Sequence, residues 1–395
     1  MKKILFFDAN DTTVDLIQLA KSRGYYTISC DNKKDNAGHR YSDKQYYEST
    51  YDIEKLEDIV RSEKIDGMVY YTSGHGLYAA SHLVDKFNLP GISFSVINSM
   101  SDKDKFRQFL CDNQLPHPLF NVFDEPADNY LINFDFPVIV KPVDSGGNRG
   151  ITKVENQEDL RTAAEYAFSQ SLCGKIIVEQ FIESDLQING DCLIENGKVR
   201  VAFLGKYLYN SPTSIIPYAT IFSTETINPL DRERIVSTIQ HVVDKACIKD
   251  GVLNVELRVD KHTAEVYFIE INTRHSGNRI YLLMNNMLDV STEDWAISLS
   301  VGEPSGVKEK INETYYCAYC ILYSKENGVL TNLEIDPKLL QYTIEHKIFV
   351  SQGDDIRAFE RLQDRLALLH LKFDSQEEMM NIIGNIENYY KVELK

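Results

Sequence analysis

The chain has 395 residues, of which 43% are hydrophobic and 26% are charged, and its formal net charge at pH 7 is −17. A surface this acidic repels phosphate, which excludes non-specific binding to nucleic acid or to an anionic membrane. No apolar stretch is long enough to cross a bilayer, the start reads as a strand instead of a signal peptide, and the seven scattered cysteines are typical of reduced thiols. We therefore expect a soluble, globular, cytoplasmic protein of two or three compact units.

Residues 1 to about 95 alternate strands with amphipathic helices. The hydrophobic pattern predicts strands at 3–7, 27–30 and 67–71 and helices at 13–22, 53–62 and 77–87. This alternation indicates an α/β layer. The turn 72–76 leads into the last of these helices, where its N–H groups could face a ligand, although a plain helix cap is the simpler interpretation.

The common signatures of several enzyme classes are absent from the sequence. No G-x-x-x-x-G-K-[ST] motif occurs, and the first strand opens into Asp8-Ala9-Asn10-Asp11 without the glycines of a dinucleotide fingerprint. Neither a P-loop NTPase nor an NAD enzyme is therefore favoured. Cys317 and Cys320 form one CxxC pair inside an apolar run, without a second pair of ligands, so we interpret them as part of a buried strand.

A lysine and a glycine-rich loop follow the predicted strand 137–142. Lys141 comes near the end of this strand, and residues 143–150 contain Gly146, Gly147 and Gly150. Glycines allow backbone N–H groups to turn inward and form an anion-binding nest, and the lysine adds a mobile positive charge for the same phosphates. The alternative is an ordinary glycine-rich hairpin turn.

Two glutamates lie on either side of a predicted hairpin that turns near Thr263. The spacing places Glu256 opposite Glu270, and it places 255, 257 and 259 opposite 271, 269 and 267 on an apolar face. Carboxylates that face each other repel, and a divalent cation between them removes the repulsion. With the Asn272 carbonyl they form a hard-oxygen set suited to Mg²⁺. The alternative is an exposed sheet face neutralised by arginines.

The remaining residues are predicted to form a third, mixed unit. Residues 303–306 contain proline and glycine and end the region that carries the motifs. Strands follow from residue 315, and the last pattern, at 377–389, has helical period. The acidic clusters in this part are most simply solvated helix faces.

Taken in order, these motifs resemble those of the ATP-grasp superfamily, in particular its biotin-carboxylase-like and amino-acid-ligase-like branches. The resemblance covers most of the chain. Four segments carry it. Ser101-Asp102-Lys103 with Gln114-Leu115-Pro116 is similar to the DK…GxP segment, and residues 136–150 are similar to the segment with the second ATP lysine and the mobile loop. Residues 178–183 are similar to the adenine hinge, and residues 268–274 are similar to the EINxR strand.

The resemblance implies a fold of mixed α/β and α+β class. It implies an α/β pre-ATP-grasp domain over 1–95, a two-lobed ATP-grasp domain over 96–300 and an α+β domain over 301–395. The residues implied to bind ATP are Lys103, Lys141, Ser145, Gly146, Gly147, Gly150, Glu179, Gln180, Phe181, Ile182 and Gln187. Those implied to bind Mg²⁺ or Mn²⁺ are Glu256, Glu270 and Asn272.

For Glu179 and Gln187 the resemblance also implies which part of ATP each side chain contacts. Glu179 is implied to meet the adenine amino group. Gln187 stands where many members of the superfamily have a glutamate that contacts the ribose, and the segment 183–191 is one residue longer than usual. An amide can still hydrogen-bond a hydroxyl group.

The activity implied by the resemblance is that of an ATP-dependent carboxylate–amine ligase. ATP would phosphorylate a substrate carboxylate, an amine would attack the acyl phosphate, and ADP and phosphate would leave. Lys141 and Arg274 are the catalytic candidates, with Arg274 binding the carboxylate or its developing charge. Lys206 and the segment 207–212 are expected on the substrate side, whereas Arg258 is expected to be structural.

The expected partners are small molecules, an amino acid or small metabolite acid together with an amine, and the resemblance also suggests a homodimer. Three alternatives remain open. They are a bicarbonate-activating, carboxylase-like enzyme, an ATP-grasp phosphotransferase, and a non-catalytic ATP-binding regulatory module.

Overall fold

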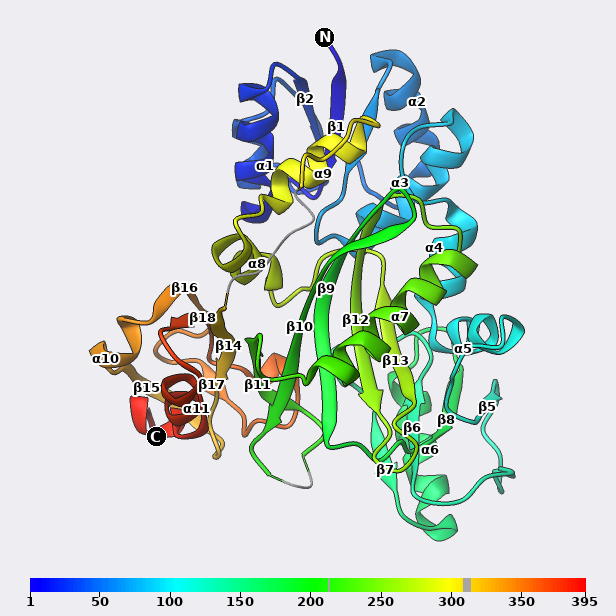
Figure 1. The fold of residues 1–395 in the computed structure, drawn as a ribbon, viewed down its shortest axis with the longest axis vertical. Helices are drawn as coiled ribbons and strands as arrows, with labels where there is room; N and C mark the ends of the chain where they lie inside the picture. Colours follow the sequence, from blue (N-terminus) through cyan, green and yellow to red (C-terminus); the bar gives the residue numbers. More distant parts are fainter. Residues whose placement is uncertain (212–213, 308–313) are drawn as a thin grey trace.

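The computed structural model describes residues 1–211, 214–307 and 314–395. Four β-sheets organise it, with helices packed on their faces. In Figure 1 the N-terminal layer lies at the top, the long strands of the largest sheet run through the middle, and a small sheet and the C-terminal elements lie on opposite sides below. Within the described ranges no helix is both long enough and apolar enough to cross a membrane.

The N-terminal layer is a parallel sheet of order β3-β2-β1-β4. Its elements are β1 (Lys3–Phe7), α1 (Asp11–Ser22), β2 (Tyr26–Cys30), the 3-10 turn η1 (Ala37–Arg40), β3 (Lys44–Tyr46), α2 (Ile53–Glu63), β4 (Gly67–Val69) and α3 (Gly74–Phe87). The predicted α/β layer is confirmed, although β4 ends before Tyr71, whose φ is +24°. Ser73 caps α3 by accepting a hydrogen bond from the Gly76 N–H, which confirms the cap interpretation of this turn.

A small antiparallel sheet of order β5-β8-β6-β7 follows. Its elements are α4 (Phe94–Ser101), α5 (Lys103–Asp112), β5 (Phe120–Phe123), β6 (Val138–Pro142), β7 (Thr152–Val154), α6 (Gln157–Gln170) and β8 (Ile176–Gln180). Val138 and Val140 of β6 pack in a core with Leu160 of α6. Because side chains alternate along a strand, Ile139 and Lys141 point to the opposite face, where they line a cavity.

The largest sheet has eight antiparallel strands in the order β13-β12-β9-β10-β11-β14-β18-β16. Its elements up to residue 300 are β9 (Leu186–Glu195), β10 (Lys198–Tyr209), β11 (Pro217–Ser223), α7 (Pro229–Lys245), β12 (Gly251–Val259), β13 (Val266–Asn272), α8 (Ile280–Leu288) and α9 (Thr292–Ser300). Ile235 and Ile239 of α7 pack in the same core as Val255 and Phe268 of the hairpin. This apolar face fixes the hairpin, so its other face is free to carry polar groups.

The C-terminal part both extends this sheet and forms one of its own. Its elements are β14 (Tyr316–Leu322), β15 (Gly328–Ile335), α10 (Pro337–Leu340), β16 (Thr343–Ile348), β17 (Asp355–Ile356), η2 (Leu362–Asp364), β18 (Ala367–Phe373), α11 (Gln376–Gly384), η3 (Ile386–Tyr389) and β19 (Tyr390–Leu394), with the third sheet ordered β17-β15-β19. Cys317 and Cys320 lie buried in β14 as unpaired thiols, as predicted. The helix predicted at 377–389 ends at Gly384.

Two contacts link the regions that the sequence separates. Tyr281 of α8 and Ile297 of α9 pack in the same core as Ile4 and Phe6 of β1, so this segment returns to the N-terminal layer. Strands β14, β18 and β16 continue the sheet of β9 to β13 across residue 300. The division into 1–95, 96–300 and 301–395 therefore stays a proposal about folding units.

Candidate active site

The hairpin of β12 and β13 brings two glutamates together. Val255 pairs with Ile271 and Glu256 pairs with Glu270, in the predicted register. The register then shifts by one residue, so that Leu257 pairs with Phe268 and Val259 pairs with Val266. The prediction for these two outer pairs is therefore wrong.

The cause of the shift is a β-bulge, in which one strand contributes an extra residue. That residue is Ile269, which is left out of the ladder and lines a cavity. The bulge thus keeps Glu270 facing Glu256, and it turns the apolar side chain of Ile269 toward the cavity.

Hydrogen bonds hold both carboxylates in place. The Tyr207 hydroxyl donates to Glu256 Oε1 at 2.9 Å, and Asn272 Nδ2 donates to Glu270 Oε1 at 3.0 Å. Glu270 Oε2 lies 3.9 Å from Lys103 Nζ. Burial and the facing charge of Glu270 raise the pKa of Glu256 to about 7. Burial opposes ionisation of Glu270 as well, but Lys103 and the Asn272 amide hold its pKa below the usual value.

This donor set fits a hard divalent cation. Burial, and after it the facing charge of Glu270, raise the pKa of Glu256, and a cation between the carboxylates would offset both effects. Because the Asn272 nitrogen donates to Glu270, its carbonyl oxygen is left to face an ion. In the described part of the chain no group of three His, Cys, Asp or Glu side chains is placed to hold a metal. Glu256, Glu270 and the Asn272 carbonyl are the residues that would hold Mg²⁺.

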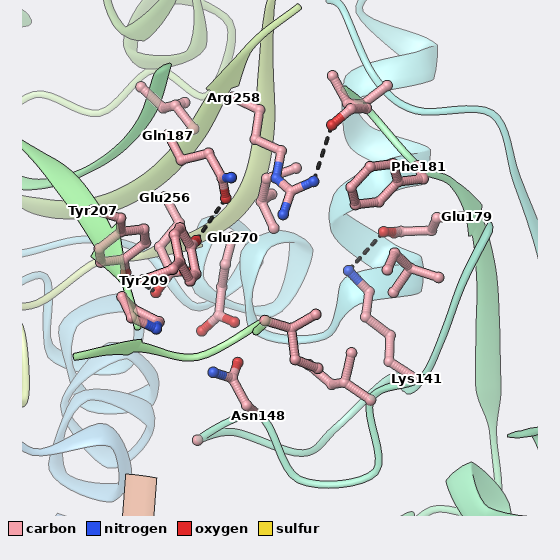
Figure 2. Close-up of a pocket in the computed structure, with 18 of the residues that line it drawn as sticks. Lys141, Asn148, Glu179, Phe181, Gln187, Tyr207, Tyr209, Glu256, Arg258 and Glu270 are labelled. Carbon is pink, nitrogen blue, oxygen red and sulfur yellow. Dashed lines mark hydrogen bonds and ion pairs between the residues drawn. The ribbon is translucent and has the colours of Figure 1, made fainter. Parts of the chain in front are cut away.

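A cavity of about 160 Å³ lies between the small sheet and the largest sheet. Figure 2 shows Lys141, Glu179 and Phe181 on one side of it and Tyr207, Tyr209 and Glu256 on the other. The predicted site residues that line it are Lys141, Gly147, Glu179, Gln180, Phe181, Ile182, Gln187, Glu256 and Glu270. Three of the four motif segments, 136–150, 178–183 and 268–274, therefore meet at one cavity, together with Glu256.

A second cavity of about 200 Å³ adjoins the first, since both are lined by Ile269 and Glu270. The other predicted site residues that line it are Lys103, Ser145, Gly146, Asn272 and Arg274. Among the residues implied to bind ATP or the metal, Gly150 alone lines neither cavity. Its φ is +77°, and a Cβ there would lie 2.8 Å from Pro142 Cγ, so glycine is required at this position by the backbone and by packing.

The glycine loop is attached to the start of α5. Lys103 donates from its backbone N–H to the Val143 carbonyl at 3.0 Å and from its ammonium to the Ser145 carbonyl at 2.7 Å. Gly147 and Asn148 both have positive φ, at +68° and +59°, which forms a tight turn beside the cavity. The loop and the first lysine therefore reach the same space.

Glu179 is paired with two cations. Its carboxylate lies 2.6 Å from Lys141 Nζ and 2.8 Å from Arg107 Nε, and all three side chains are almost fully buried. Burial lowers the pKa of Lys141 to about 8. Burial opposes ionisation of Glu179, yet Arg107 and Lys141 bring its pKa down to about 2. The predicted contact of Glu179 with adenine stays a proposal, because both carboxylate oxygens already face cations.

Sequence reasoning missed Arg107. Its signal was its place four residues after Lys103, which puts both side chains on one face of α5. Arg258, expected to be structural, lines the first cavity, donates to the Ile182 carbonyl at 2.9 Å and lies over the Phe181 ring at 4.7 Å. Its role therefore includes shaping the hinge side of the cavity.

The expected substrate-side segment is only partly at the cavity. Tyr207 and Tyr209 line it and Lys206 does not, because alternate side chains of β10 point to opposite faces. Tyr209 donates to Gln187 Oε1 at 2.6 Å, which leaves the Gln187 amide nitrogen as a donor toward the cavity. Pro212 lies outside the described residues.

Arg274 lies at the edge of the second cavity. It lines that cavity and donates from Nη1 to the His275 carbonyl at 2.8 Å. Burial lowers its pKa, although Glu270 and Asp191 favour the charged form. The guanidinium therefore stays available to an anion next to the carboxylate pair.

Comparisons with known proteins agree with this arrangement. Residues 121–276 match the family described as the D-ala D-ala ligase C-terminus. The carbamoyl phosphate synthase large chain of Thermotoga petrophila is 28% identical over 271 residues, which cover 67% of this chain and 24% of that protein. The same protein of Helicobacter pylori strain J99 is 24% identical over 369 residues, or 91% of this chain and 32% of that one. The chain spans about a quarter of the length of the first curated relatives.

Solved structures match the whole chain. An L-amino acid ligase from Bacillus licheniformis superposes with a TM-score of 0.82 at 19% identity, covering 100% of this chain and 99% of that one. A phosphoribosylglycinamide synthetase from Anaerococcus prevotii gives 0.75 at 18% identity, with 100% of both chains covered. The biotin carboxylase domain of a Hydrogenobacter thermophilus 2-oxoglutarate carboxylase, crystallised as a dimer with MgADP, ADP and bicarbonate, gives 0.70 at 18% identity, covering 100% and 91%.

The small sheet and the largest sheet on either side of the cavity, the facing carboxylate pair and the superposition on these solved structures identify an ATP-grasp fold. These homologues and structural neighbours are ATP-dependent ligases of the ATP-grasp family. Residues 121–276 match the ligase family, the whole chain has the ATP-grasp fold, and one neighbour with this fold was crystallised with MgADP.

Proposed function

We propose that the protein is an ATP-dependent carboxylate–amine ligase that acts through an acyl phosphate. The observation that carries the proposal is the meeting of the Glu256–Glu270 pair with Lys103, Lys141 and Arg274 at two adjoining cavities. Such a set of groups can hold a triphosphate at one end and a carboxylate at the other. The match to ligases in both family and fold supports this assignment.

Phosphorylation activates the carboxylate, which is otherwise a poor electrophile because its oxygen cannot leave as oxide. Lys141 and Lys103 hold the phosphates of ATP, and Arg274 holds the substrate carboxylate so that its oxygen attacks the γ-phosphorus as the bond to ADP breaks. When bound, Mg²⁺ offsets charge on the phosphate oxygens. The amine then attacks the acyl carbon, phosphate leaves, and the amine loses a proton.

Water must be kept from the acyl phosphate. The loop 145–150 lies over the start of α5, and a Cβ at Gly147 would lie 2.7 Å from Gln363 Nε2 in η2. The loop is thus packed between the N-terminal end of α5 and the C-terminal part of the chain. That position allows it to cover the phosphates during the reaction.

The substrates belong to the same proposal. We assign an amino acid or small metabolite acid and an amine, with Tyr207 and Tyr209 near the acceptor, and ribose contact through Gln187. The L-amino acid ligase neighbour supports this choice of substrate. We also propose a cytoplasmic homodimer without nucleic-acid or membrane partners, which the acidic composition and the dimeric biotin carboxylase domain support.

The test is release of ADP and phosphate from Mg-ATP across a matrix of amino acids, small acids, amines and bicarbonate, with mass spectrometry of each product. Phosphate release that needs an acid and an amine together, with a condensed product, supports the ligase. Release that depends on bicarbonate alone supports the carboxylase-like alternative, and a phosphorylated product without free phosphate supports a phosphotransferase. Tight Mg-ATP binding without ADP across the matrix contradicts the proposal and favours a binding module.

A further inference from the structure

Arg107 is the most completely buried charged side chain of the candidate site. It is fully buried on α5, and none of the motifs discussed above includes it. Its Nε lies 2.8 Å from Glu179 Oε1, and its Nη2 lies 3.3 Å from Glu179 Oε2. A buried charge is costly unless it is paired, so this arginine and Glu179 depend on each other.

The charges of this cluster do not cancel. Lys141 lies 2.6 Å from the same carboxylate, so two cations share one anion. If Arg107 were absent, Glu179 and Lys141 would form a closed neutral pair, and the ammonium would be held by the carboxylate. With Arg107 present, the carboxylate is balanced by the guanidinium, and the charge of Lys141 is left for a phosphate.

Arg107 also connects the small sheet to the largest sheet beside the first cavity. Besides Glu179 on β8, its Nη2 donates to the Ile269 carbonyl on β13 at 2.8 Å. Ile269 precedes Glu270 on β13, so one guanidinium contacts both β8 and the strand that carries Glu270. A lysine could not make these contacts together, because its single ammonium lacks the planar fork of donors.

The contacts of Arg107 are not those of a residue retained for stability alone. Its Nη1 is buried and has no hydrogen-bond partner among the described residues. Replacing a buried ion cluster by apolar groups is often neutral or stabilising, so an incompletely bonded guanidinium here indicates a functional reason for its charge.

We propose that Arg107 is a positioning residue for ATP, which binds the hinge carboxylate of Glu179 and thereby frees Lys141 to bind the nucleotide phosphates. This inference rests on the proposed use of ATP. Arg107 itself touches no phosphate. It acts through Glu179, because Lys141 and Glu179 line the cavity and Arg107 does not.

The test compares Arg107→Met with the wild-type protein by calorimetric titration with Mg-ATP and with adenosine, which lacks phosphates. We expect the Kd for Mg-ATP to rise at least about tenfold, as for loss of a charged contact, while the Kd for adenosine stays within about twofold. Arg61→Met is the matched control, since Arg61 is an exposed helix arginine that pairs with Asp58 at 3.1 Å and lies 5.9 Å from the centre of the Phe87 ring, away from the candidate site.

The double variant Arg107→Met/Glu179→Gln tests the cause. It removes one positive and one negative charge together, so Lys141 no longer faces a carboxylate, and we expect most of the lost Mg-ATP affinity to return. This variant also keeps the test decisive if Arg107→Met alone does not fold, because it leaves the net charge of the buried cluster as it is in the wild-type protein. A folded double variant that binds Mg-ATP no better than the single variant, or not at all, contradicts the proposal.

The pH dependence gives a further measurement. Lys141 is faced by Glu179 from β8, by Arg107 and Lys103 from α5, and by the carboxylates of the β12–β13 hairpin. Because Arg107 is a like charge, its loss should move the midpoint of the pH dependence of Mg-ATP binding upward from the wild-type value. A merely structural role predicts an unchanged midpoint.

Two results would overturn the inference. One is a folded Arg107→Met protein with wild-type affinity for Mg-ATP, and the other is a parallel loss of Mg-ATP and adenosine binding without recovery in the double variant. If the wild-type protein itself binds no Mg-ATP, the proposed function fails, and that outcome is distinguished from failure of the inference by the wild-type titration alone.

Discussion

The Tyr207 hydroxyl donates to Glu256 Oε1 at 2.9 Å, and this bond joins β10 to the carboxylate pair of the β12–β13 hairpin. Groups that orient a metal ligand in this way affect metal affinity strongly. Tyr207 is half-buried, and both burial of its hydroxyl and the charge of Glu256 raise its pKa well above the usual value, so the hydroxyl stays a donor. It therefore fixes which oxygen of Glu256 can face an ion.

Tyr207→Phe should raise the Mg²⁺ concentration for half-maximal activity about tenfold, because a hydrogen bond to a charged group contributes about 1.5–3 kcal/mol. The measurement is a Mg²⁺ titration of ADP release at a fixed, saturating Mg-ATP concentration. Tyr209→Phe is the control, since Tyr209 lies on the same strand face and donates to Gln187 instead. An equal shift in both variants would contradict the assignment.

Glu270→Ala should abolish turnover, because it removes one of the two facing carboxylates and the partner of Lys103. Folding is checked by circular dichroism and activity by ADP release. Glu265→Ala, at an exposed position of the same hairpin, should retain activity. Near-normal turnover in Glu270→Ala would contradict the assignment of Glu270 as a metal ligand.

The sequence predicted the hairpin well because the two faces differ in polarity, which specifies register wherever one face is buried. It did not predict the bulge at Ile269, because the local pattern is compatible with a regular ladder and tertiary packing decides between them. The helix at 377–389 was predicted too long for a similar reason. Gly384 ends it, and the apolar residues beyond pack from a 3-10 turn.

In the candidate site, too, the sequence predicted the residues that local motifs carry and missed those that depend on tertiary packing. Lys103, Lys141 and Glu270 were found because short motifs carry them, and the structure brings all three to adjoining cavities. Arg107 and Arg258 were not found as site residues, because spacing can show that an arginine shares a helix face with Lys103 but cannot show whether that face is buried. Only the packing of α5 against the hinge shows that Arg107 is fully buried.

Lys141 gives the site a pH dependence. Burial lowers its pKa from 10.5 to about 8, so in the folded protein the ammonium loses its proton as the pH rises through about 8. The unfolded chain still binds that proton up to its normal pKa, so the contribution of this group to stability rises with pH between the two values. Affinity for Mg-ATP should move in the opposite direction and fall above about pH 8.

The measurement is the Kd for Mg-ATP from pH 6.5 to 9.5. Lys141→Arg should flatten the upper part of this profile, because a guanidinium stays charged throughout the range. The Lys105→Arg protein, changed at an exposed lysine paired with Asp102, should keep the wild-type profile. A wild-type affinity that is constant to pH 9.5 would show that Lys141 does not carry the phosphate contact.

Gly150 should be required for stability. At φ +77° a side chain is strained, and a Cβ would also meet Pro142 Cγ at 2.8 Å and Gln170 Cβ at 2.9 Å. Gly174 has a similar φ of +73° with nothing within 4 Å, so Gly174→Ala measures the backbone strain alone. We expect Gly174→Ala to cost roughly 1 kcal/mol and Gly150→Ala roughly 1–3 kcal/mol more, by urea denaturation. Equal losses in the two variants would mean that the loop moves freely away from β6, and the loop would then have no fixed packing against Pro142 and α6.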